Sequence, residues 1–208
     1  MAIEAVIFDI GNVLVEWYPE RPFDRLLGEA RRKELFAKVD FTGMNDLSDI
    51  GARQMADGVQ ELARRHPEDA DDILLWRDHW MEMLAPDLPQ SATILRALRA
   101  NGMAVHALSN FGDATFDMAE QHYPILKEFD IRFISARLKM MKPDPELYAH
   151  VETELGLPTD RLLFIDDRDD NIVAAAARGW QTHLFTTSEK LAADMVARGL
   201  LTEQEVAA

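Results

Sequence analysis

The stretch FDIGNVLV, residues 8–15, decides the fold, because an apolar run from Ile3 to Phe8 ends there at a carboxylate, Asp9, followed by Gly11. Glycine lets the backbone approach an anionic group closely and leaves N–H donors free, as binding a phosphoryl or carboxylate oxygen at a strand end requires. A carboxylate held there can act as a nucleophile. Taken alone, however, the segment is more often an aspartate that caps an ordinary turn.

Length and composition describe a globular chain with a full core. The chain has 208 residues, of which 48% are hydrophobic, enough for one domain with a sizeable insertion or for two small domains. No stretch approaches the roughly 20 apolar residues that cross a bilayer, and the first residues lack the basic region of a secretion signal, so we expect a cytoplasmic protein. The absence of cysteine excludes disulfides, thiolate catalysis and sulfur-ligated metals, and makes carboxylates the expected ligands of any ion.

The charge of the chain limits its partners. A formal net charge of -15 disfavours binding to nucleic acid or to an anionic membrane surface. A local basic pocket can still hold a small anion, so we expect a small-molecule metabolite as the substrate. The sequence leaves the oligomeric state open between a monomer and a homodimer.

Apolar runs bounded by turn residues predict five buried strands. They extend from Ile3 to Phe8, Met103 to Leu108, Ile131 to Ile134, Leu162 to Ile165 and Thr182 to Phe185. Segments with helical period and caps lie between the later runs, from Ser91 to Gly102, from Asp144-Pro145 to Gly156, and from Asp169 or Asp170 to Gly179. This alternation predicts an α/β fold with a doubly wound, Rossmann-like parallel sheet.

The interval from about Glu16 to Gln90 interrupts the alternation. It contains no convincing strand, only helical patterns over residues 24–39, 51–65 and 71–84. Because the interval leaves the sheet directly after the turn at Asp9, we expect an inserted helical cap above the strand ends, with residues 85–90 as the hinge. The predicted division is a core of residues 1–15 and 91–208 and a cap of residues 16–90.

Four short polar segments should meet at one edge of the predicted sheet. They are Asp9, Ser109-Asn110, Lys142 and Asp166-Asp167, each at a strand end or before a helix start. Singly, each has a plain structural explanation as a turn, a surface lysine or a helix cap. Jointly, they supply a nucleophilic carboxylate, hydroxyl and amide donors, a fixed cation and a carboxylate pair able to hold Mg²⁺, which are the parts that phosphoryl transfer needs.

The order of these segments resembles the haloacid dehalogenase-like (HAD) hydrolase superfamily, whose four motifs match Asp9, Ser109, Lys142 and Asp166-Asp167. The segments FDIGNVLV, LSNF, MKPDPELY and FIDDRDDN are most similar to the branch with a helical cap after the first motif that contains bacterial alpha-D-glucose-1-phosphate phosphatase-like members. The resemblance implies Mg²⁺-dependent hydrolysis of a small phosphorylated metabolite through an aspartyl-phosphate intermediate, with sugar 1-phosphates among the candidate substrates.

The resemblance also implies a role for each matching residue. Asp9 would be the nucleophile, and Lys142 would offset negative charge on Asp9 and on the phosphoryl oxygens. The implied phosphate-binding residues are Gly11, Asn12, Ser109, Asn110 and Lys142. The implied Mg²⁺ ligands are Asp9, the carbonyl of Gly11, Asp166 and Asp167, with Asp170 and Asn171 orienting the waters of the ion.

Gly11 departs from the phosphatase pattern. Most phosphatases of the superfamily carry a second aspartate there, two residues after the nucleophile, as general acid and then base. Such assistance is typically worth about a hundred- to ten-thousand-fold in rate, so we expect substrates whose leaving group needs little protonation. We also expect slow hydrolysis of the aspartyl-phosphate unless a cap residue or an ordered water replaces the base, because Asn12 cannot shuttle a proton at neutral pH.

Two other functions stay open. A metal-independent 2-haloacid dehalogenase shares the fold, the aspartate nucleophile and the Ser-Asn and Lys segments, but the pair Asp166-Asp167 makes sense chiefly when Mg²⁺ is present. A catalytically weak protein that binds a phosphorylated ligand is the other alternative, although Asp9 and Lys142 are both retained. Outside the motifs, Glu16, Trp17 and Tyr18 are candidates for the cavity entrance, and Trp76 and Trp80 are expected to pack on one face of a cap helix.

Overall fold

The structure, a computed structural model, describes residues 2–207 and contains a five-stranded parallel sheet in the order β5-β4-β1-β6-β7. The strands are β1 (Ala5–Phe8), β4 (Ala104–Ser109), β5 (Arg132–Ile134), β6 (Leu162–Asp166) and β7 (Gln181–Leu184). The predicted α/β fold is confirmed, because all five expected strands are present. Within residues 2–207, no helix has both the length and the apolar character needed to cross a bilayer.

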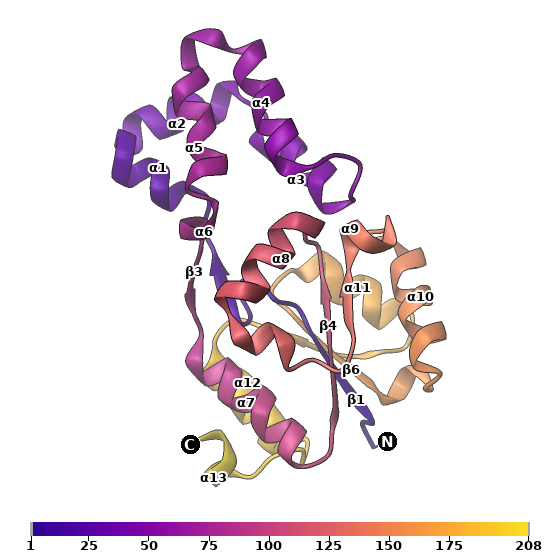
Figure 1. Cartoon of the computed structure of the whole chain (residues 1–208). Coiled ribbons are helices and arrows are strands. Elements are labelled where there is room, and N and C mark those ends of the chain that lie inside the picture. Colours follow the sequence, from indigo (N-terminus) through magenta and orange to yellow (C-terminus); the bar gives the residue numbers. More distant parts are fainter. Residues whose placement is uncertain (1, 208) are drawn as a thin grey trace.

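Strand β1 lies in the middle of the sheet, and its side chains alternate between two buried faces. Val6 and Phe8 belong to one hydrophobic cluster, whereas Ala5 and Ile7 belong to the other. The first face is covered by α7 (Pro89–Ala100), α8 (Asp113–His122) and α12 (Ser188–Ala197), and the second by α10 (Pro145–Leu155) and α11 (Asp169–Ala177) (Figure 1). Burial on both faces explains why this strand is an uninterrupted apolar run.

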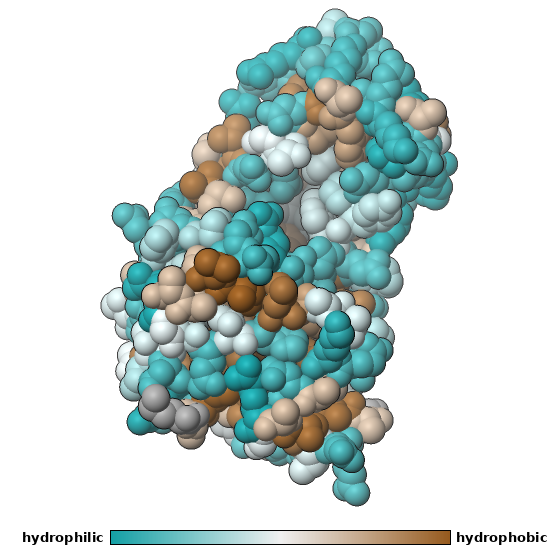
Figure 2. All heavy atoms as spheres, turned by 180° about the vertical axis from the view of Figure 1, so that it is seen from behind, coloured by the Kyte–Doolittle hydropathy of each residue, from teal (hydrophilic) through white to brown (hydrophobic). Residues whose placement is uncertain are grey.

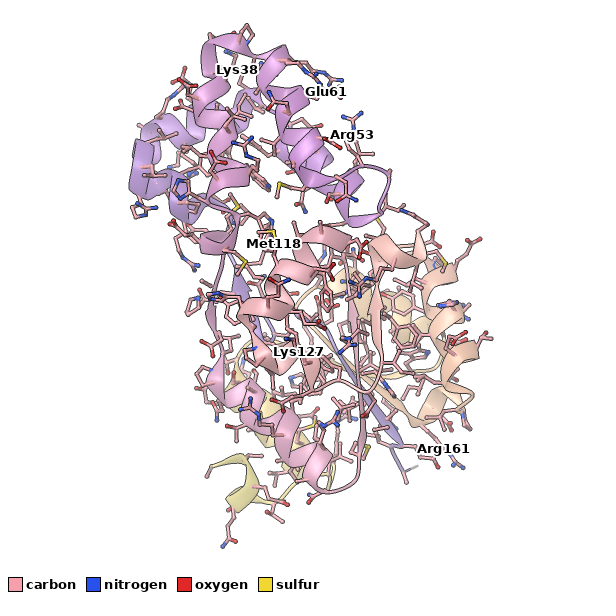
Figure 3. The ribbon with its side chains drawn as sticks, in the orientation of Figure 1. Lys38, Arg53, Glu61, Met118, Lys127 and Arg161 are labelled. Atoms are coloured by element: carbon pink, nitrogen blue, oxygen red, sulfur yellow. The ribbon has the colours of Figure 1, made fainter. Side chains whose placement is uncertain are left out.

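The helices that follow β1 in the chain form a separate helical region beyond the carboxyl ends of the parallel strands (Figure 1). They are α1 (Glu20–Leu27), α2 (Glu29–Lys38), α3 (Phe41–Asp49), α4 (Met55–Arg65), α5 (Ala70–Asp78) and α6 (Trp80–Met83). Aromatic rings fill the interior of this region, where Phe41 and Trp76 stack with their centroids 4.9 Å apart. Figure 3 shows Lys38 and Glu61 at the end of the region farthest from the sheet, and Arg161 at the opposite end of the molecule.

Two strands contradict the expectation that residues 16–90 contain no strand. β2 (Val15–Trp17) and β3 (Leu84–Asp87) pair antiparallel and carry the chain to and from the helical region. The sequence obscures β3 because Pro86 lacks an N–H donor and is tolerated only at a sheet edge or an irregularity. The predicted hinge over residues 85–90 is therefore a strand in its first half and leads into α7 at Pro89.

Helix boundaries differ from the expectations where a local signal was misread. The pattern over 24–39 is two helices, α1 and α2, because Gly28 between them has a φ of +81° that interrupts the helix. Helix α7 starts at Pro89, a favoured first helical residue, and the hydroxyl of Ser91 instead lies 2.8 Å from that of Ser188. Likewise Arg168, not an aspartate, is the N-cap of α11.

Other boundary signals were read correctly. Asp144 caps α10 by accepting a hydrogen bond from the backbone of Glu146, and Gly156 ends this helix with a left-handed conformation. Helices α3, α8 and α12 were not predicted. The remaining short elements are α9 (Ser135–Leu138), α13 (Glu203–Val206) and three single 3₁₀ turns at Pro67–Asp69, Pro124–Lys127 and Thr159–Arg161.

Candidate active site

Three neighbouring strand ends bring the predicted polar residues together. Because β1 lies between β4 and β6, Asp9 after β1 falls between Ser109 and Asp166, the last residues of the flanking strands. The backbone N–H of Asp9 donates to the carbonyl of Ile165 at 2.8 Å, which extends the β1–β6 pairing to the start of the turn. The sheet itself therefore positions these three side chains.

The Asp9 carboxylate is nearly buried and is held through both oxygens. Oδ1 accepts hydrogen bonds from the Ser109 hydroxyl at 2.7 Å and from the backbone N–H of Ile10 at 2.7 Å. Oδ2 lies 3.0 Å from Nζ of Lys142. These contacts fix the orientation of the carboxylate toward the space beyond the strand ends.

Lys142 lies between two acidic side chains. Its Nζ is 2.6 Å from Oδ2 of Asp166 in addition to its contact with Asp9, and the residue is only 2% exposed. The Asn110 side chain holds the lysine backbone from both sides, since Nδ2 donates to the Lys142 carbonyl at 2.9 Å and Oδ1 accepts from the Lys142 N–H at 2.8 Å. Asn110 thus positions the lysine, and its expected donation to a substrate stays a prediction.

The loop after β6 carries the paired carboxylates. Asp166 is fully buried and accepts hydrogen bonds from the backbone of Arg168 at 2.8 Å and from the Asn171 amide at 3.0 Å to each oxygen. Asp167 accepts a hydrogen bond from Nδ2 of Asn12 at 3.0 Å. This contact ties the loop after β6 to the turn after β1.

Asn171 is brought to the site, but Asp170 is not. Asn171 lines the central cavity, whereas the Asp170 carboxylate pairs with Arg168 at 2.7 Å and is not among the lining residues. The expectation that Asp170 orients waters of a bound ion therefore has no support in its position. The sequence could not separate these two neighbours, because both follow the motif and both are polar.

Asp9, Asp166 and Asp167 fit a divalent cation. Each offers one carboxylate oxygen, and these atoms lie within 4.8 Å of one another. Oδ1 of Asn171 is buried nearby without a hydrogen-bond partner among the described residues, which is an acceptor available to a water of an ion. A donor set made only of oxygens is the one that Mg²⁺ prefers.

The electrostatics of the site favour an added positive charge. Burial raises the pKa of the Asp9 carboxyl to about 7; Lys142 opposes this rise, and the nearby Asp166 adds to it. Burial also raises the pKa of Asp167. Burial alone would lower the pKa of Lys142, but Asp9 and Asp166 outweigh it and raise this pKa above its usual value. One ammonium group therefore faces three carboxylates.

A cavity of about 580 Å³ lies above these groups, between the sheet edge and the helical region. Figure 2 shows from behind how the surface is hollowed between the smaller and the larger lobe. The core contributes Asp9, Asn12, Ser109, Lys142 and Asp167 to its walls. The opposite side carries polar groups from α3, namely Thr42, Asn45, Asp46 and Asp49, and aromatic rings from Trp17, Trp76 and Trp80, and the core adds the ring of Phe111.

Neither the backbone conformation nor a lack of space for a side chain requires a glycine at position 11. Its φ lies outside the left-handed region, and a Cβ built on it would have only the Cβ of Trp17 nearby, at 3.8 Å. The left-handed residue of this turn is instead Asn12, with a φ of +56°. Oδ1 of Asn12 accepts from the Trp17 backbone at 2.9 Å, so this side chain joins the turn to the start of the helical region.

Sequence reasoning missed several lining residues. Trp76 and Trp80 are buried as predicted, but they lie on two helices, α5 and α6, and not on one face of a single helix, and both also line the cavity. Of the three entrance candidates, Trp17 lines the cavity, Glu16 pairs with Arg21 and Tyr18 is exposed. Asp49 carried no signal, because it belongs to a helix that the sequence pattern did not predict.

Known proteins are similar to this chain in sequence and in fold. The haloacid dehalogenase-like hydrolase family matches residues 3–198. Sesquiterpene phosphatase astK of Aspergillus oryzae is 28% identical over 180 residues, which cover 85% of this chain and 86% of that protein. A HAD family enzyme from Bacteroides thetaiotaomicron, solved in complex with magnesium and inorganic phosphate, superposes with a TM-score of 0.71 at 23% identity, over 89% of this chain and 96% of that one.

A dehalogenase structure is also similar. The L-2-haloacid dehalogenase from Xanthobacter autotrophicus, solved with chloropropionic acid covalently bound, has a TM-score of 0.63 at 17% identity and covers 98% of this chain and 86% of that one. Identities this low establish a common fold. The choice between the two chemistries therefore rests on the residues of the site.

Proposed function

This chain belongs to the haloacid dehalogenase-like hydrolase family, and we propose that it is a magnesium-dependent phosphatase of a small phosphorylated metabolite. The observation that carries the proposal is the meeting of three carboxylates, Asp9, Asp166 and Asp167, around the buried ammonium group of Lys142. A site of this kind repels an anionic substrate until a divalent cation is bound, and binds a phosphate monoester once it is.

In the proposed reaction, an oxygen of Asp9 attacks the phosphorus atom, and the bond from phosphorus to the ester oxygen breaks. Ser109 holds Asp9 in the attacking orientation, and Lys142 offsets the charge that accumulates on the phosphoryl oxygens. A bound Mg²⁺, held by Asp9, Asp166, Asp167 and the Gly11 carbonyl, would neutralise negative charge and align the phosphoryl group. Asn171 is the residue that we assign to orienting its waters.

The core and the cap have different proposed roles. The core, residues 1–15 and 91–208, carries the phosphoryl chemistry, with Gly11, Asn12 and Ser109 at the phosphate and Asn110 positioning Lys142. The cap, residues 16–90, supplies the walls that contact the rest of the substrate. The antiparallel pair of β2 and β3 is the connection between the two.

We assign the substrate to the sugar 1-phosphates. An aromatic wall with Trp17 and Trp80, whose centroids are 5.8 Å apart, can stack on the face of a sugar ring, and Asn45 and Asp46 on α3 offer partners for its hydroxyl groups. A second candidate is an isoprenyl monophosphate, which the same aromatic rings favour and which is suggested by the name of the Aspergillus oryzae relative.

The alternatives fit the site less well. Dehalogenation of a 2-haloacid would bring a carboxylate substrate close to Asp9 and Asp167, with only the Lys142 ammonium group, already paired with Asp9 and Asp166, to screen the negative charge. Binding without turnover would make little use of a nucleophile held by Ser109 and Lys142.

A substrate panel tests the proposal. Hexose 1-phosphates, hexose 6-phosphates and an isoprenyl monophosphate are assayed for phosphate release with Mg²⁺ and with a chelator, beside halide release from 2-chloropropionate, with Asp9→Asn as the control. The proposal requires phosphate release that depends on both Mg²⁺ and Asp9. Halide release that survives the chelator would replace it with dehalogenation, and stabilisation by fluoroberyllate without any turnover would replace it with binding.

A further inference from the structure

We propose that Asp49, at the end of α3, is the general acid and base of this site and replaces the carboxyl group that Gly11 lacks. The inference rests on the proposed phosphatase function, and it identifies the residue that moves the proton.

Asp49 shares the cavity with the reacting groups but enters it from the opposite side. Asp9, Lys142 and Asp167 line the cavity from the core, and Asp49 lines it from the helical region. A proton donor for the leaving group has to lie on the side of the phosphorus opposite to the attacking oxygen, because displacement at phosphorus is in line. A carboxyl group that lines the cavity from the cap, while Asp9 lines it from the core, is suited to this role.

The end of α3 is fastened to the core beside the site. The Ser135 hydroxyl donates to the carbonyl of Asp49, and the Lys139 ammonium group donates to the carbonyl of Gly51. The residues that follow α3 pack tightly against α9, since a Cβ on Gly51 would lie 2.3 Å from the carbonyl oxygen of Ala136. Asp49 is therefore held at a fixed place over the cavity.

The end of α3 also packs against the loop that follows Ser109. A Cβ on Gly112 would lie 2.5 Å from the hydroxyl of Ser48, the residue before Asp49, so the helix and this loop touch directly. The loop begins with Asn110, which positions Lys142. Asp49 and the phosphoryl-binding groups thus share one rigid support.

The other polar groups of the cavity are engaged or unsuited. Asp9 is the proposed nucleophile, and Asp167 is tied to Asn12 and faces the metal site. Asp46, one turn before Asp49, is exposed. The amide of Asn45 and the hydroxyl of Thr42 cannot act as an acid or a base at neutral pH. Asp49 is the carboxyl group left to do so.

The surroundings of Asp49 keep its proton available near neutral pH. Burial raises the pKa of this carboxyl to about 7; the charges of Asp46 and Asp9 add to the rise, and hydrogen bonds from the Gly112 backbone and from Asn45, at 2.8 Å, oppose it. The position at the C-terminal end of α3 acts in the same direction, because a helix C-terminus disfavours an anion. A pKa close to the working pH suits a group that must both give and take a proton.

The two proposed half-reactions balance. In the first, the Asp9–phosphorus bond forms, the bond from phosphorus to the ester oxygen breaks, and protonated Asp49 gives its proton to that oxygen. In the second, the Asp49 carboxylate takes a proton from a water whose oxygen attacks phosphorus, and the Asp9–phosphorus bond breaks. Inorganic phosphate and the free Asp9 carboxylate are released, and Asp49 is protonated again.

The test compares Asp49→Asn with the control Asp57→Asn on the full chain, because Asp57 is an exposed carboxylate of α4 that does not line the cavity. With an alkyl phosphate, whose leaving group needs a proton, we expect Asp49→Asn to lose about a hundred-fold or more in kcat/KM, which reports the steps up to departure of the leaving group, and with p-nitrophenyl phosphate about tenfold or less. The phosphorylated Asp9 intermediate should accumulate in Asp49→Asn, and the pH–rate profile should lose its limb near pH 7. Asp57→Asn should keep the wild-type dependence on leaving group and on pH.

A second variant separates proton transfer from folding. Gly11→Asp in the Asp49→Asn background restores a carboxyl group close to the site without touching α3, and we expect it to recover at least tenfold of the lost turnover of the alkyl phosphate. An equal loss of kcat/KM for both leaving groups in Asp49→Asn, or wild-type turnover of the alkyl phosphate, overturns the role of Asp49 while leaving the phosphatase proposal in place. Absence of phosphate release and of any phosphorylated Asp9 in the wild type overturns both.

Discussion

The Lys142 ammonium group lies 2.6 Å from the Asp166 carboxylate, and the two side chains are 1% and 0% exposed. Nζ is also 3.0 Å from the Asp9 carboxylate, so one buried cation serves two buried anions. A buried charge without a partner is expensive, whereas a paired and hydrogen-bonded one is tolerated. This arrangement makes the stability of the core depend on the same groups that we assign to catalysis.

Removal of the cation should destabilise the protein. In Lys142→Met, Asp9 and Asp166 lose their partner, and we expect the free energy of unfolding in chelator to fall by about 3–5 kcal/mol, with partial recovery in Mg²⁺. Urea unfolding measures this, with Lys127→Met, on an exposed turn of the core (Figure 3), as the control. Equal stability of the two variants in chelator would contradict the buried charge cluster.

Asp49→Asn should change the dependence of stability on pH. The pKa of Asp49 is about 7 in the folded protein and near 3.8 when the chain is unfolded, so the folded state keeps a proton that the unfolded state releases between about pH 4 and pH 7. The contribution of Asp49 to the free energy of unfolding therefore decreases as pH rises through this window. An asparagine at this position resembles the protonated carboxyl group, so the free energy of unfolding of the variant does not fall in this way as the pH rises.

Melting curves in chelator measure this effect. We expect Asp49→Asn and the wild type to have similar Tm values near pH 4 and the variant to be the more stable one near pH 8. A difference in Tm that is constant over this range, or that favours the wild type at the higher pH, would show that Asp49 titrates as an ordinary exposed carboxyl.

Two glycines should respond in opposite ways to alanine. Gly11 has room for a Cβ, whereas Gly51 has a φ of +67° and a Cβ there would lie 2.3 Å from the Ala136 carbonyl oxygen. We expect Gly11→Ala to unfold within about 0.5 kcal/mol of the wild type, and Gly51→Ala to lose on the order of 1–3 kcal/mol and to impair turnover by displacing α3. Thermal unfolding and steady-state kinetics of both variants check this. Wild-type behaviour of Gly51→Ala would mean that the docking of α3 is dispensable.

Trp17 should select the substrate. Its ring lies in the cavity wall at 5.8 Å from that of Trp80, so Trp17→Ala should raise KM for a hexose 1-phosphate about tenfold and leave acetyl phosphate, which has no ring, nearly unchanged. Tyr18→Ala is the control, because Tyr18 is exposed outside the cavity. The same substrate ranking in Trp17→Ala and in the wild type would remove this residue from the specificity site.

The sequence predicted the sheet well because buried parallel strands are uninterrupted apolar runs. Ala5 to Phe8 and Leu162 to Ile165 are such runs, and both belong to inner strands of the sheet in the structure. The pair of β2 and β3 gave no such signal, since one strand has three residues and the other contains Pro86. Short strands that owe their existence to pairing with each other have no periodicity to detect.

The site was predictable where chain order alone determines proximity. Asp9, Ser109 and Asp166 end neighbouring strands, so the topology brings them together. Asp49 could not be found in this way, because its place over the site depends on a contact between its backbone and Ser135, 86 residues later in the chain. The expected role of Asp170 in orienting waters lacks support for the converse reason, because its carboxylate pairs with Arg168, two residues away and at the surface.

The central claim is that Asp9 becomes phosphorylated in a reaction that requires Mg²⁺. The most direct measurement is peptide mass mapping after rapid acid quench of Asp49→Asn mixed with an active phosphate ester, because slow hydrolysis should preserve the intermediate in this variant. We predict a mass increase of one phosphoryl group on the peptide that contains Asp9, present with Mg²⁺ and absent with chelator. Phosphate release by an active enzyme that leaves this peptide unmodified, or the same label in an Asp9→Asn, Asp49→Asn double variant, would contradict the account.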